Sequence, residues 1–440
     1  MRIVLIYICA AASCMAQDTA RMEQVIRHYV DQKQFMGTVL VAKGDQTVLS
    51  KGYGMANLEW KIPNAPDTKF RLGSITKQFT GAGILLLQER GKLNVSDPVS
   101  KFLKDAPAAW DGITLAQLLS HTSGIPSFTS FKEYRESEPF ETTPEKTILR
   151  FKDKPLDFRP GEKWSYSNSG YVLLGYVIEK ASGQSYGDFV RQNIFVPLEM
   201  KDSGYDSNFS VIERRATGYS PTPRGVETAG FIHMSIPHAA GALYSTTEDL
   251  LRWQRGLFGG KLLKPESIEA MTTAVKEGYA FGVGVKEEKG RRRVSHGGGI
   301  EGFNTMLIAY PKERVTIAVL GNLNGQAPEK IAASLDKLLF GEAVELPSER
   351  KEVKVPTEQL SAYTGTYSLT IGAMMTVTLE EGQLMAQLTN QPKFPIFAQT
   401  PTRFFWKVVD AQVEFEKGSG SSVTGLVLFQ NGREIKATKN

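Results

Sequence analysis

Residues 71–93 read RLGSITKQFTGAGILLLQERGKL, with a serine and a lysine three residues apart at the start of an apolar run. Residues three apart on a helix lie on the same face, so Ser74 and Lys77 are expected to be neighbours. The small residues at 81–83 suit a helix that packs closely against others, and Gly91 suits its C-terminal end. This segment predicts a buried central helix that carries the serine and lysine at its beginning.

A serine hydroxyl is a weak nucleophile until another group takes its proton. Lysine can take that proton if burial lowers its pKa, and the positive end of a helix acts in the same direction. Free backbone N–H groups at a helix N-terminus can also stabilise an oxyanion. The motif alone is not specific, because Ser334-x-x-Lys337 in a surface-like helical stretch and Ser348-x-x-Lys351 in a charged linker also match it.

Two further motifs accompany the first. Tyr166-Ser167-Asn168 lies in FRPGEKWSYSNSGY, a Pro/Gly/Ser-rich loop of the kind that often carries catalytic groups, and no other tyrosine heads a Tyr-x-Asn. His296 is followed by three glycines at the end of a predicted strand. Glycines there would let a substrate approach the backbone edge closely.

In this order, the three motifs resemble those of the serine β-lactamase and penicillin-binding-protein superfamily, and most of all its class C-like branch of esterases and D-amino-acid peptidases. They are Ser74-x-x-Lys77, Tyr166-x-Asn168 and His296-Gly297-Gly298. The resemblance spans roughly residues 30–340, and the segment 355–440 looks like the lipocalin-like domain that often follows such domains. It implies an α+β fold, with an antiparallel sheet flanked by a helical subdomain, followed by a small antiparallel β-barrel-like domain.

Carried over by position, the resemblance implies a role for each motif residue. Ser74 attacks a carbonyl and becomes acylated, while Lys77 and Tyr166 share the work of the base and Tyr166 passes a proton to the leaving group. Asn168 binds Lys77 or the substrate amide, and the N–H groups of Ser74 and Gly299 form an oxyanion hole. The remaining substrate-binding positions of the third motif are His296 and Gly298. No metal or other cofactor is implied.

One departure bears on the substrate. In β-lactamases of this type the third motif begins with lysine, whereas here it begins with His296, which has an ordinary pKa of about 6.5 and is mostly neutral at pH 7. This change favours an esterase or peptidase acting on a small ester or a D-amino-acid-containing peptide. Weak β-lactamase or penicillin-binding activity is one alternative. A non-catalytic cell-wall-peptide binding protein is another, although the chain retains Ser74, Lys77 and Tyr166.

Two other kinds of hydrolase fit the sequence poorly. GQSYG at 183–187 matches G-x-S-x-G, the nucleophile motif of lipase-like hydrolases. In that fold an HGGG segment precedes the nucleophile, whereas here HGGG begins at His296 and follows it. GQSYG is also expected to join two helices, where that fold requires a strand, a turn and a helix. A metal hydrolase would need a ligand motif such as HExxH, which is absent from the sequence. We therefore expect His121 to be a structural residue beside the pocket, and His233 and His238 to be loop or core residues.

The chain length of 440 residues favours two domains. Residues 1–16 have the layout of a secretory signal peptide, the serine hydrolase domain is expected at 17–345, and a linker with the C-terminal β domain at 346–440. The protein is then exported, either periplasmic or secreted. Both cysteines, Cys9 and Cys14, lie in the leader, so the mature chain has no disulfide, although a lipid anchor on Cys14 stays open. No other apolar run is long enough for a transmembrane segment.

Basic residues are scattered along the chain, whose net charge is +5. The one cluster, 291–293, is expected to be a solvated turn and is too short to indicate nucleic acid. The expected partner is a small-molecule or peptide substrate, and the oligomeric state is open. Local patterns also predict strands within 37–60 and 279–320, helices beginning after Thr114 and Thr143, a helix over 171–181 that ends near Gly183, and a linker within 337–360.

Overall fold

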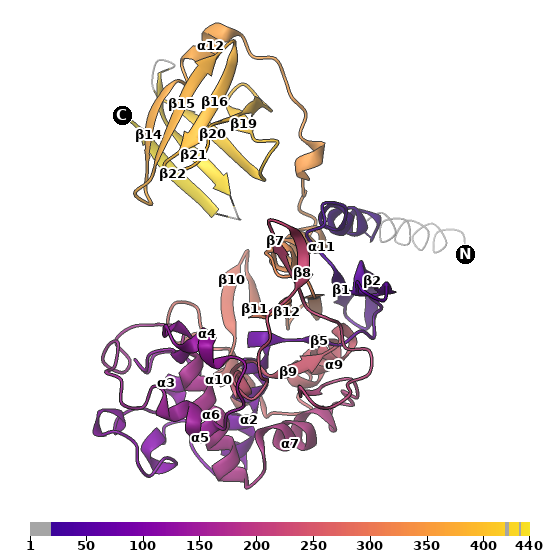
Figure 1. Ribbon diagram of the computed structural model, residues 1–440, viewed down its shortest axis with the longest axis vertical. Coiled ribbons are helices and arrows are strands. Elements are labelled where there is room, and N and C mark those ends of the chain that lie inside the picture. The colour runs from indigo at the N-terminus through magenta and orange to yellow at the C-terminus, as the bar shows by residue number, and fades with distance from the viewer. Residues whose placement is uncertain (1–18, 419–421, 431–432) are drawn as a thin grey trace, which may run out of the picture. The chain divides into compact units, whose positions relative to one another are not determined.

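The computed structural model describes residues 19–418, 422–430 and 433–440. The chain divides into two compact units, Met1–Phe340 and Gly341–Asn440 (Figure 1). The leader expected at 1–16, with both cysteines, lies outside the described residues. Within the described ranges, no helix combines the length and the apolar character needed to cross a membrane.

The first unit is built on a six-stranded antiparallel sheet with the order β10-β11-β12-β13-β1-β2. Its strands are β1 (Gly37–Lys43), β2 (Gln46–Tyr53), β10 (Gly284–Glu288), β11 (Arg291–Ile300), β12 (Phe303–Tyr310) and β13 (Val315–Gly321). The neighbouring strands β1 and β13 are almost continuously apolar and buried, and helices α9 (Thr247–Phe258) and α11 (Ala327–Leu339) pack against this part of the sheet. The strands expected within 37–60 are therefore present, and those expected within 279–320 are present from Gly284 onward.

Helices gather beside this sheet in a second region of the same unit (Figure 1). They are α2 (Thr76–Glu89), α3 (Leu115–Leu119), α4 (Tyr134–Ser137), α5 (Pro144–Leu149), α6 (Asn168–Ser182), α7 (Tyr186–Val190), α8 (His238–Gly241) and α10 (Pro265–Thr272). Helix α2 is buried over most of its length and contacts α6 and α8. A Cβ on Gly81 would come within 2.6 Å of the Phe281 carbonyl oxygen, and one on Gly83 within 3.1 Å of Ile178. The predicted close packing of the central helix is confirmed.

The predicted helix ends are also confirmed. Thr114 and Gln117 form a capping box before α3, and the Thr143 side chain caps α5, whose first residue is proline. Helix α6 ends at Gly183, which has a φ of 74°, a left-handed conformation that glycine adopts without strain. GQSYG joins the two helices α6 and α7.

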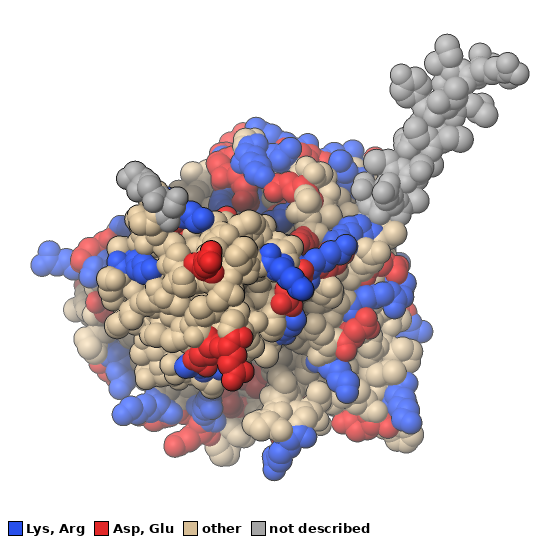
Figure 2. Space-filling view, turned by 90° about the horizontal axis from the view of Figure 1, so that it is seen from above, with Lys and Arg blue, Asp and Glu red and all other residues tan. Residues whose placement is uncertain are grey.

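Two expectations for the region around β11 are wrong. The arginines at 291–293 begin strand β11 instead of forming a solvated turn, because their backbone pairs with residues 286–288 of β10. Their side chains also have partners: Arg291 lies over the Phe340 ring, Arg292 pairs with Glu269 and Glu287, and Arg293 pairs with Asp336. The strand expected from residue 279 begins only at Gly284, after a turn. Figure 2 shows basic and acidic side chains interspersed on the face that it draws.

Short strands complete the first unit. They form the sheet β5-β9-β6 and the hairpins β3-β4 and β7-β8, from β3 (Met55–Asn57), β4 (Ile62–Pro63), β5 (Phe70–Arg71), β6 (Gly204–Tyr205), β7 (Tyr219–Thr222), β8 (Gly225–Thr228) and β9 (Leu243–Ser245). Strand β5 leads directly into the segment that carries Ser74. The sheet β5-β9-β6 thus fixes the approach to the predicted nucleophile.

The second unit is a single nine-stranded antiparallel sheet that curls into a nearly closed barrel, as expected for a β-barrel-like domain. A short helix, α12 (Thr357–Ser361), precedes β14 (Gly365–Leu369), β15 (Met374–Glu380), β16 (Gln383–Leu388), β17 (Phe394–Pro395), β18 (Phe397–Ala398), β19 (Arg403–Phe405), β20 (Ala411–Lys417), β21 (Val423–Gln430) and β22 (Arg433–Lys439). The first and last strands in the sheet order, β17 and β18, are separated in sequence only by the buried Ile396. An aromatic core that includes Tyr363 and Phe415 fills the interior.

Candidate active site

Ser74 lies in a single turn of 3₁₀ helix, Gly73–Ile75, that runs into the buried helix α2. Gly73 has a φ of +54°, and a Cβ there would lie 2.8 Å from the backbone nitrogen of Gly299 on β11. Only glycine avoids both the strained backbone conformation and this clash. The Ser74 turn therefore packs directly on the β11 backbone, which brings the first and third motifs together.

Lys77 is completely buried in the first turn of α2. Its Nζ lies 3.0 Å from Ser74 Oγ, 2.9 Å from Asn168 Oδ1 and 2.8 Å from the carbonyl oxygen of Ala240. Burial lowers the pKa of Lys77 well below its ordinary value. A neutral amine has two N–H groups, which the two carbonyl-type oxygens accept, so its lone pair is left to face the Ser74 hydroxyl.

Tyr166 approaches Lys77 from the loop before α6, and Asn168 approaches it as the first residue of that helix. The Asn168 side chain donates from Nδ2 to Thr129 Oγ1 at 3.0 Å, a contact that turns its amide oxygen toward Lys77. The Tyr166 ring centre lies 4.8 Å from Lys77 Nζ. Burial raises the pKa of Tyr166, against the smaller opposing effect of a hydrogen bond with Ser74. Burial thus favours the protonated phenol of Tyr166 and the neutral amine of Lys77.

His121 packs against the loop that carries Tyr166 and Ser167. Its Nδ1 accepts a hydrogen bond from the Ser167 backbone at 3.1 Å, and its ring centre lies 4.3 Å from that of Tyr166. Burial lowers the pKa of His121 well below its ordinary value, and Lys77 and His296 lower it further whenever they are charged. His121 thus lies beside the pocket as a neutral residue, where the sequence placed it.

The contacts of His296 fit a neutral imidazole. Its Nδ1 is 2.5 Å from the Gly297 carbonyl oxygen, which can only accept, so Nδ1 carries the proton and Nε2 accepts from the Tyr279 hydroxyl at 2.8 Å. Burial, and then the charge of Lys77, lower the pKa of His296 to about 4. The third motif therefore supplies no positive charge at neutral pH.

The glycines that follow His296 continue β11 as part of the strand. Strand β10 pairs with β11 only as far as Ser295, so the edge of β11 beyond that residue is not paired with β10. A Cβ on Gly298 would lie 1.9 Å from the Leu72 carbonyl oxygen and 2.3 Å from Thr305 Oγ1, which itself donates to Leu72. Gly298 thus permits the close contact between β11 and the segment that carries the nucleophile.

Replacing Gly298 by alanine is expected to lower the free energy of unfolding by about 3 kcal/mol and to reduce activity, because the backbone of Leu72 must move. The adjacent Gly297→Ala is the matched control, since a Cβ there would meet its neighbours at an ordinary 3.6 Å. We expect the control to stay within about 1 kcal/mol of the parent protein. Denaturant unfolding of both variants checks this, and equal stabilities would contradict the packing argument.

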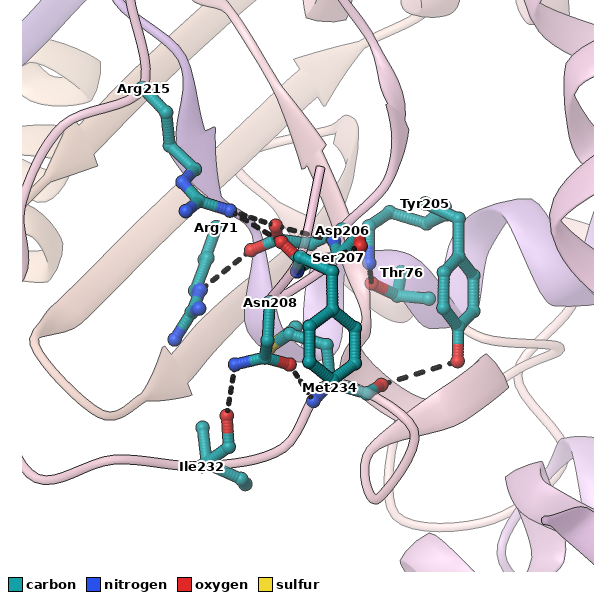
Figure 3. A network of polar contacts seen from close by, with 11 residues as sticks. Arg71, Thr76, Tyr205, Asp206, Ser207, Asn208, Arg215, Ile232 and Met234 are labelled. Atoms are coloured by element: carbon teal, nitrogen blue, oxygen red, sulfur yellow. Dashed lines mark hydrogen bonds and ion pairs between the residues drawn. The ribbon is translucent and has the colours of Figure 1, made fainter. Parts of the chain in front are cut away.

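A buried network holds the approach to Ser74 (Figure 3). The fully buried Asp206 carboxylate accepts a hydrogen bond from Arg71 Nε at 2.6 Å and pairs through its other oxygen with Arg215. Arg71 belongs to β5, and the Asp206 backbone N–H donates to the Ala242 carbonyl oxygen at 2.8 Å. Asp206 therefore connects β5 to the segment that follows α8. Helix α8 in turn supplies the Ala240 carbonyl oxygen that contacts Lys77.

The same network shapes one wall of the site. Asn208 donates to the Ile232 carbonyl oxygen at 3.0 Å and accepts from the Met234 backbone at 2.7 Å, as Figure 3 shows. Ile232 lines a cavity of about 90 Å³ that also contains Ser74. The other lining residues that the argument uses are Phe128, Tyr134, Asn168, Gly299 and Glu301.

All of the predicted site residues lie in one place, around Lys77 and this cavity. The sequence did not reveal the Ala240 carbonyl, Thr129, Tyr279 or Glu301 as parts of the site. A backbone carbonyl leaves no mark in the sequence, and Thr129 and Glu301 lie outside the three motifs. YAFGVG at 279–284 was expected to be a strand, so Tyr279 gave no signal of its contact with His296.

The arrangement places a buried lysine where it can accept the proton of a serine hydroxyl, as a serine hydrolase requires. The sequence model of the β-lactamase family matches residues 22–340, so the chain belongs to that family, within the serine β-lactamase and penicillin-binding-protein superfamily. Residues 349–439 match a domain of unknown function, DUF3471.

Three similar proteins illustrate the range of this superfamily. Penicillin-binding protein 4* of Bacillus subtilis is 31% identical, over 97% of this chain and all of its own length. An octameric penicillin-binding protein homologue from Pyrococcus abyssi has a TM-score of 0.68 at 26% identity, covering 95% of this chain and 99% of its own. A D-stereospecific amidohydrolase from Streptomyces sp. has a TM-score of 0.64 at 27% identity, covering 74% and 99%.

Proposed function

We propose that the protein is an exported serine hydrolase that cleaves a small ester or amide through an acyl-enzyme on Ser74. The observation that carries this proposal is the contact between Lys77 Nζ and Ser74 Oγ, with both N–H groups of the neutral amine held by other acceptors. The family supports hydrolysis in general. Export rests on the leader-like sequence of residues 1–16.

In the proposed reaction, the Ser74 hydroxyl gives its proton to Lys77 as Oγ attacks the substrate carbonyl carbon. The N–H groups of Ser74 and Gly299 hold the oxygen that becomes negative. Lys77 returns the proton through the Tyr166 phenol to the departing alcohol or amine, and the carbonyl–heteroatom bond breaks. Water then attacks the acyl-enzyme, gives one proton to the same relay and releases the acid with Ser74 restored.

Two observations favour an ester or amide over a β-lactam as the main substrate. The neutral His296 offers no fixed cation for the carboxylate that a β-lactam carries next to its reactive ring. The D-stereospecific amidohydrolase is named for amide hydrolysis, and this chain covers 99% of that protein at 27% identity. Slow turnover of β-lactams is the second candidate, and the substrate panel below tests it.

The test uses the mature protein and Ser74→Ala, with Ser334→Ala and Ser348→Ala as controls, because both other serines also precede a lysine by three residues. Turnover of a short-chain nitrophenyl ester, a chromogenic cephalosporin and a peptide ending in D-alanine is compared. We expect Ser74→Ala to lose activity by about 10³-fold or more, and the controls to keep it.

The same proteins are labelled with a fluorophosphonate, which reports a reactive serine directly. Labelling is expected on Ser74 alone and is expected to disappear in Ser74→Ala. If the parent protein shows neither turnover nor labelling, the hydrolase proposal is wrong, and the fold serves as a binding protein instead. Cephalosporin turnover that exceeds ester and peptide turnover would instead favour a β-lactamase.

A further inference from the structure

Glu301 is a charged residue of the catalytic cavity that the proposed reaction does not use. It follows the last residue of β11 directly and lines the cavity that contains Ser74 and Gly299. Its Oε2 atom is buried and has no hydrogen-bond partner among the described residues. Burial of a carboxylate oxygen without a partner is unfavourable, so the cavity is suited to a ligand that brings a donor.

The side chains near Glu301 do not supply that donor. Burial raises the pKa of both Tyr134 and Glu138, and the negative charge of Glu301 raises each further. Within the described part of the chain, no lysine, arginine or histidine forms an ion pair with Glu301. Arg150 lowers the pKa of Tyr134 and Arg135 lowers that of Glu138, but neither arginine pairs with Glu301 among the described residues. The unpaired Glu301 carboxylate therefore favours a cation at this end of the cavity.

Aromatic rings add to this preference. Tyr134 and Phe128 both line the cavity, with their ring centres 5.7 Å apart in an edge-to-face arrangement. The face of an aromatic ring attracts an ammonium group, and a carboxylate beside the ring strengthens the site. A carboxylate near two aromatic rings is therefore suited to an ammonium group.

The cavity also limits the size of the group. Its volume of about 90 Å³ is far below the roughly 300–1,000 Å³ of pockets that hold drug-sized ligands. A wider hollow of about 340 Å³ adjoins it, and Gly299, Ile300 and Glu301 line both. Glu301 therefore lies between a small compartment beside Ser74 and a larger, more open one.

We propose that Glu301 binds the free ammonium group of an aminoacyl substrate, so that the enzyme prefers esters or amides of small amino acids with an unblocked amino group. This inference rests on the proposed hydrolase function and adds to it the chemical class of the acyl group. Charge selects the amine, because a blocked or missing amine leaves the Glu301 carboxylate without a partner.

The test compares three 4-nitroanilides that differ only at the amino group: alanine, N-acetylalanine and propionic acid, with both alanine enantiomers assayed. Glu301→Gln keeps the side-chain shape and removes the charge. Glu313→Gln is the matched control, because Glu313 also has a buried Oε2 without a hydrogen-bond partner in the described ranges, but it lies in the turn between β12 and β13 and does not line the cavity.

The parent protein is expected to favour one alanine anilide over its acetyl and propionyl analogues by at least tenfold in kcat/KM. Glu301→Gln is expected to remove this preference, mainly through a higher KM for the free amine, with the blocked substrates changed by less than threefold. Glu313→Gln is expected to retain it. Protection of Ser74 from the fluorophosphonate by alaninamide should weaken in parallel, provided that thermal unfolding shows each variant folded.

The outcomes separate this inference from the proposed function. If Ser74 is labelled and the blocked substrates are hydrolysed as well as the free amine, the role of Glu301 is wrong and the hydrolase stands. A loss that is equal for all three substrates in Glu301→Gln would also overturn it. If no substrate is turned over and Ser74 resists labelling, both proposals fall.

Discussion

Replacing Lys77 by methionine is expected to lower kcat/KM by about 10⁴-fold without lowering the free energy of unfolding at pH 7. Methionine fills much of the same volume but cannot accept the Ser74 proton. Two acceptors, Asn168 Oδ1 and the Ala240 carbonyl, lose their donors, which costs stability. Against this, the variant avoids the free-energy cost of burying a lysine, a cost that appears as a pKa well below 10.5 for Lys77 in the folded protein.

Stability measured against pH isolates that second effect. Between the lowered folded-state pKa of Lys77 and about 10.5, the unfolded chain binds a proton at Lys77 that the folded chain does not, so this group makes stability rise with pH. Lys77→Met should therefore show a shallower rise over that range. Activity should also need neutral Lys77, so the acid limb of kcat/KM in the parent protein reports its titration.

Lys337→Met is the control for both measurements. Lys337 occupies the same place after Ser334 as Lys77 does after Ser74, but it is exposed on α11. Its replacement should leave activity, and the dependence of stability on pH, close to those of the parent protein. Comparable activity in Lys77→Met and the parent would show that another group, such as Tyr166, is the base.

Replacing Asp206 by asparagine is expected to lower the free energy of unfolding by about 3 kcal/mol or more. The change keeps the shape but leaves Arg71 and Arg215 without the buried carboxylate that both of them contact. Because Arg71 lies three residues before Ser74, we also expect reduced turnover at temperatures where the variant is still folded. Denaturant titrations followed by circular dichroism, with activity assays at low temperature, measure the two effects.

Asp45→Asn provides the comparison for an exposed pair. Asp45 forms an ion pair with Arg314 at 2.5 Å, but its side chain is 84% exposed, so its loss should cost less than about 1 kcal/mol. If the two variants lose the same stability, then burial does not decide the contribution of Asp206. Such a result would also weaken the argument that this network fixes the approach to the nucleophile.

Local rules account for what the sequence predicted correctly. The three-residue spacing placed Ser74 and Lys77 together, the side chains of Thr114 and Thr143 marked helix starts, and Gly183 marked a helix end. The family resemblance then placed the second and third motifs beside the first. In the described part of the chain, these features depend on contacts between residues a few positions apart, or on the order of the three motifs, which is typical of the family.

The parts that the sequence did not predict depend on contacts distant along the chain. Arg71 and Asp206 are 135 residues apart, and Lys77 reaches a backbone carbonyl 163 residues away. The run 291–293 looked like a solvated turn because its side-chain partners are distant in sequence. Glu269 lies on α10, Asp336 lies on α11 and Phe340 follows α11. Neither periodicity nor composition reports such pairings.

The order of strands in the C-terminal sheet has a consequence for self-association. A sheet normally exposes two unpaired edges, each a template on which another chain can add a strand. Here the two edge strands, β17 and β18, are two residues each and adjoin through Ile396, so the chain itself links the two edges. The described part of this domain therefore offers little free edge for intermolecular strand addition, which protects this β-rich domain against aggregation.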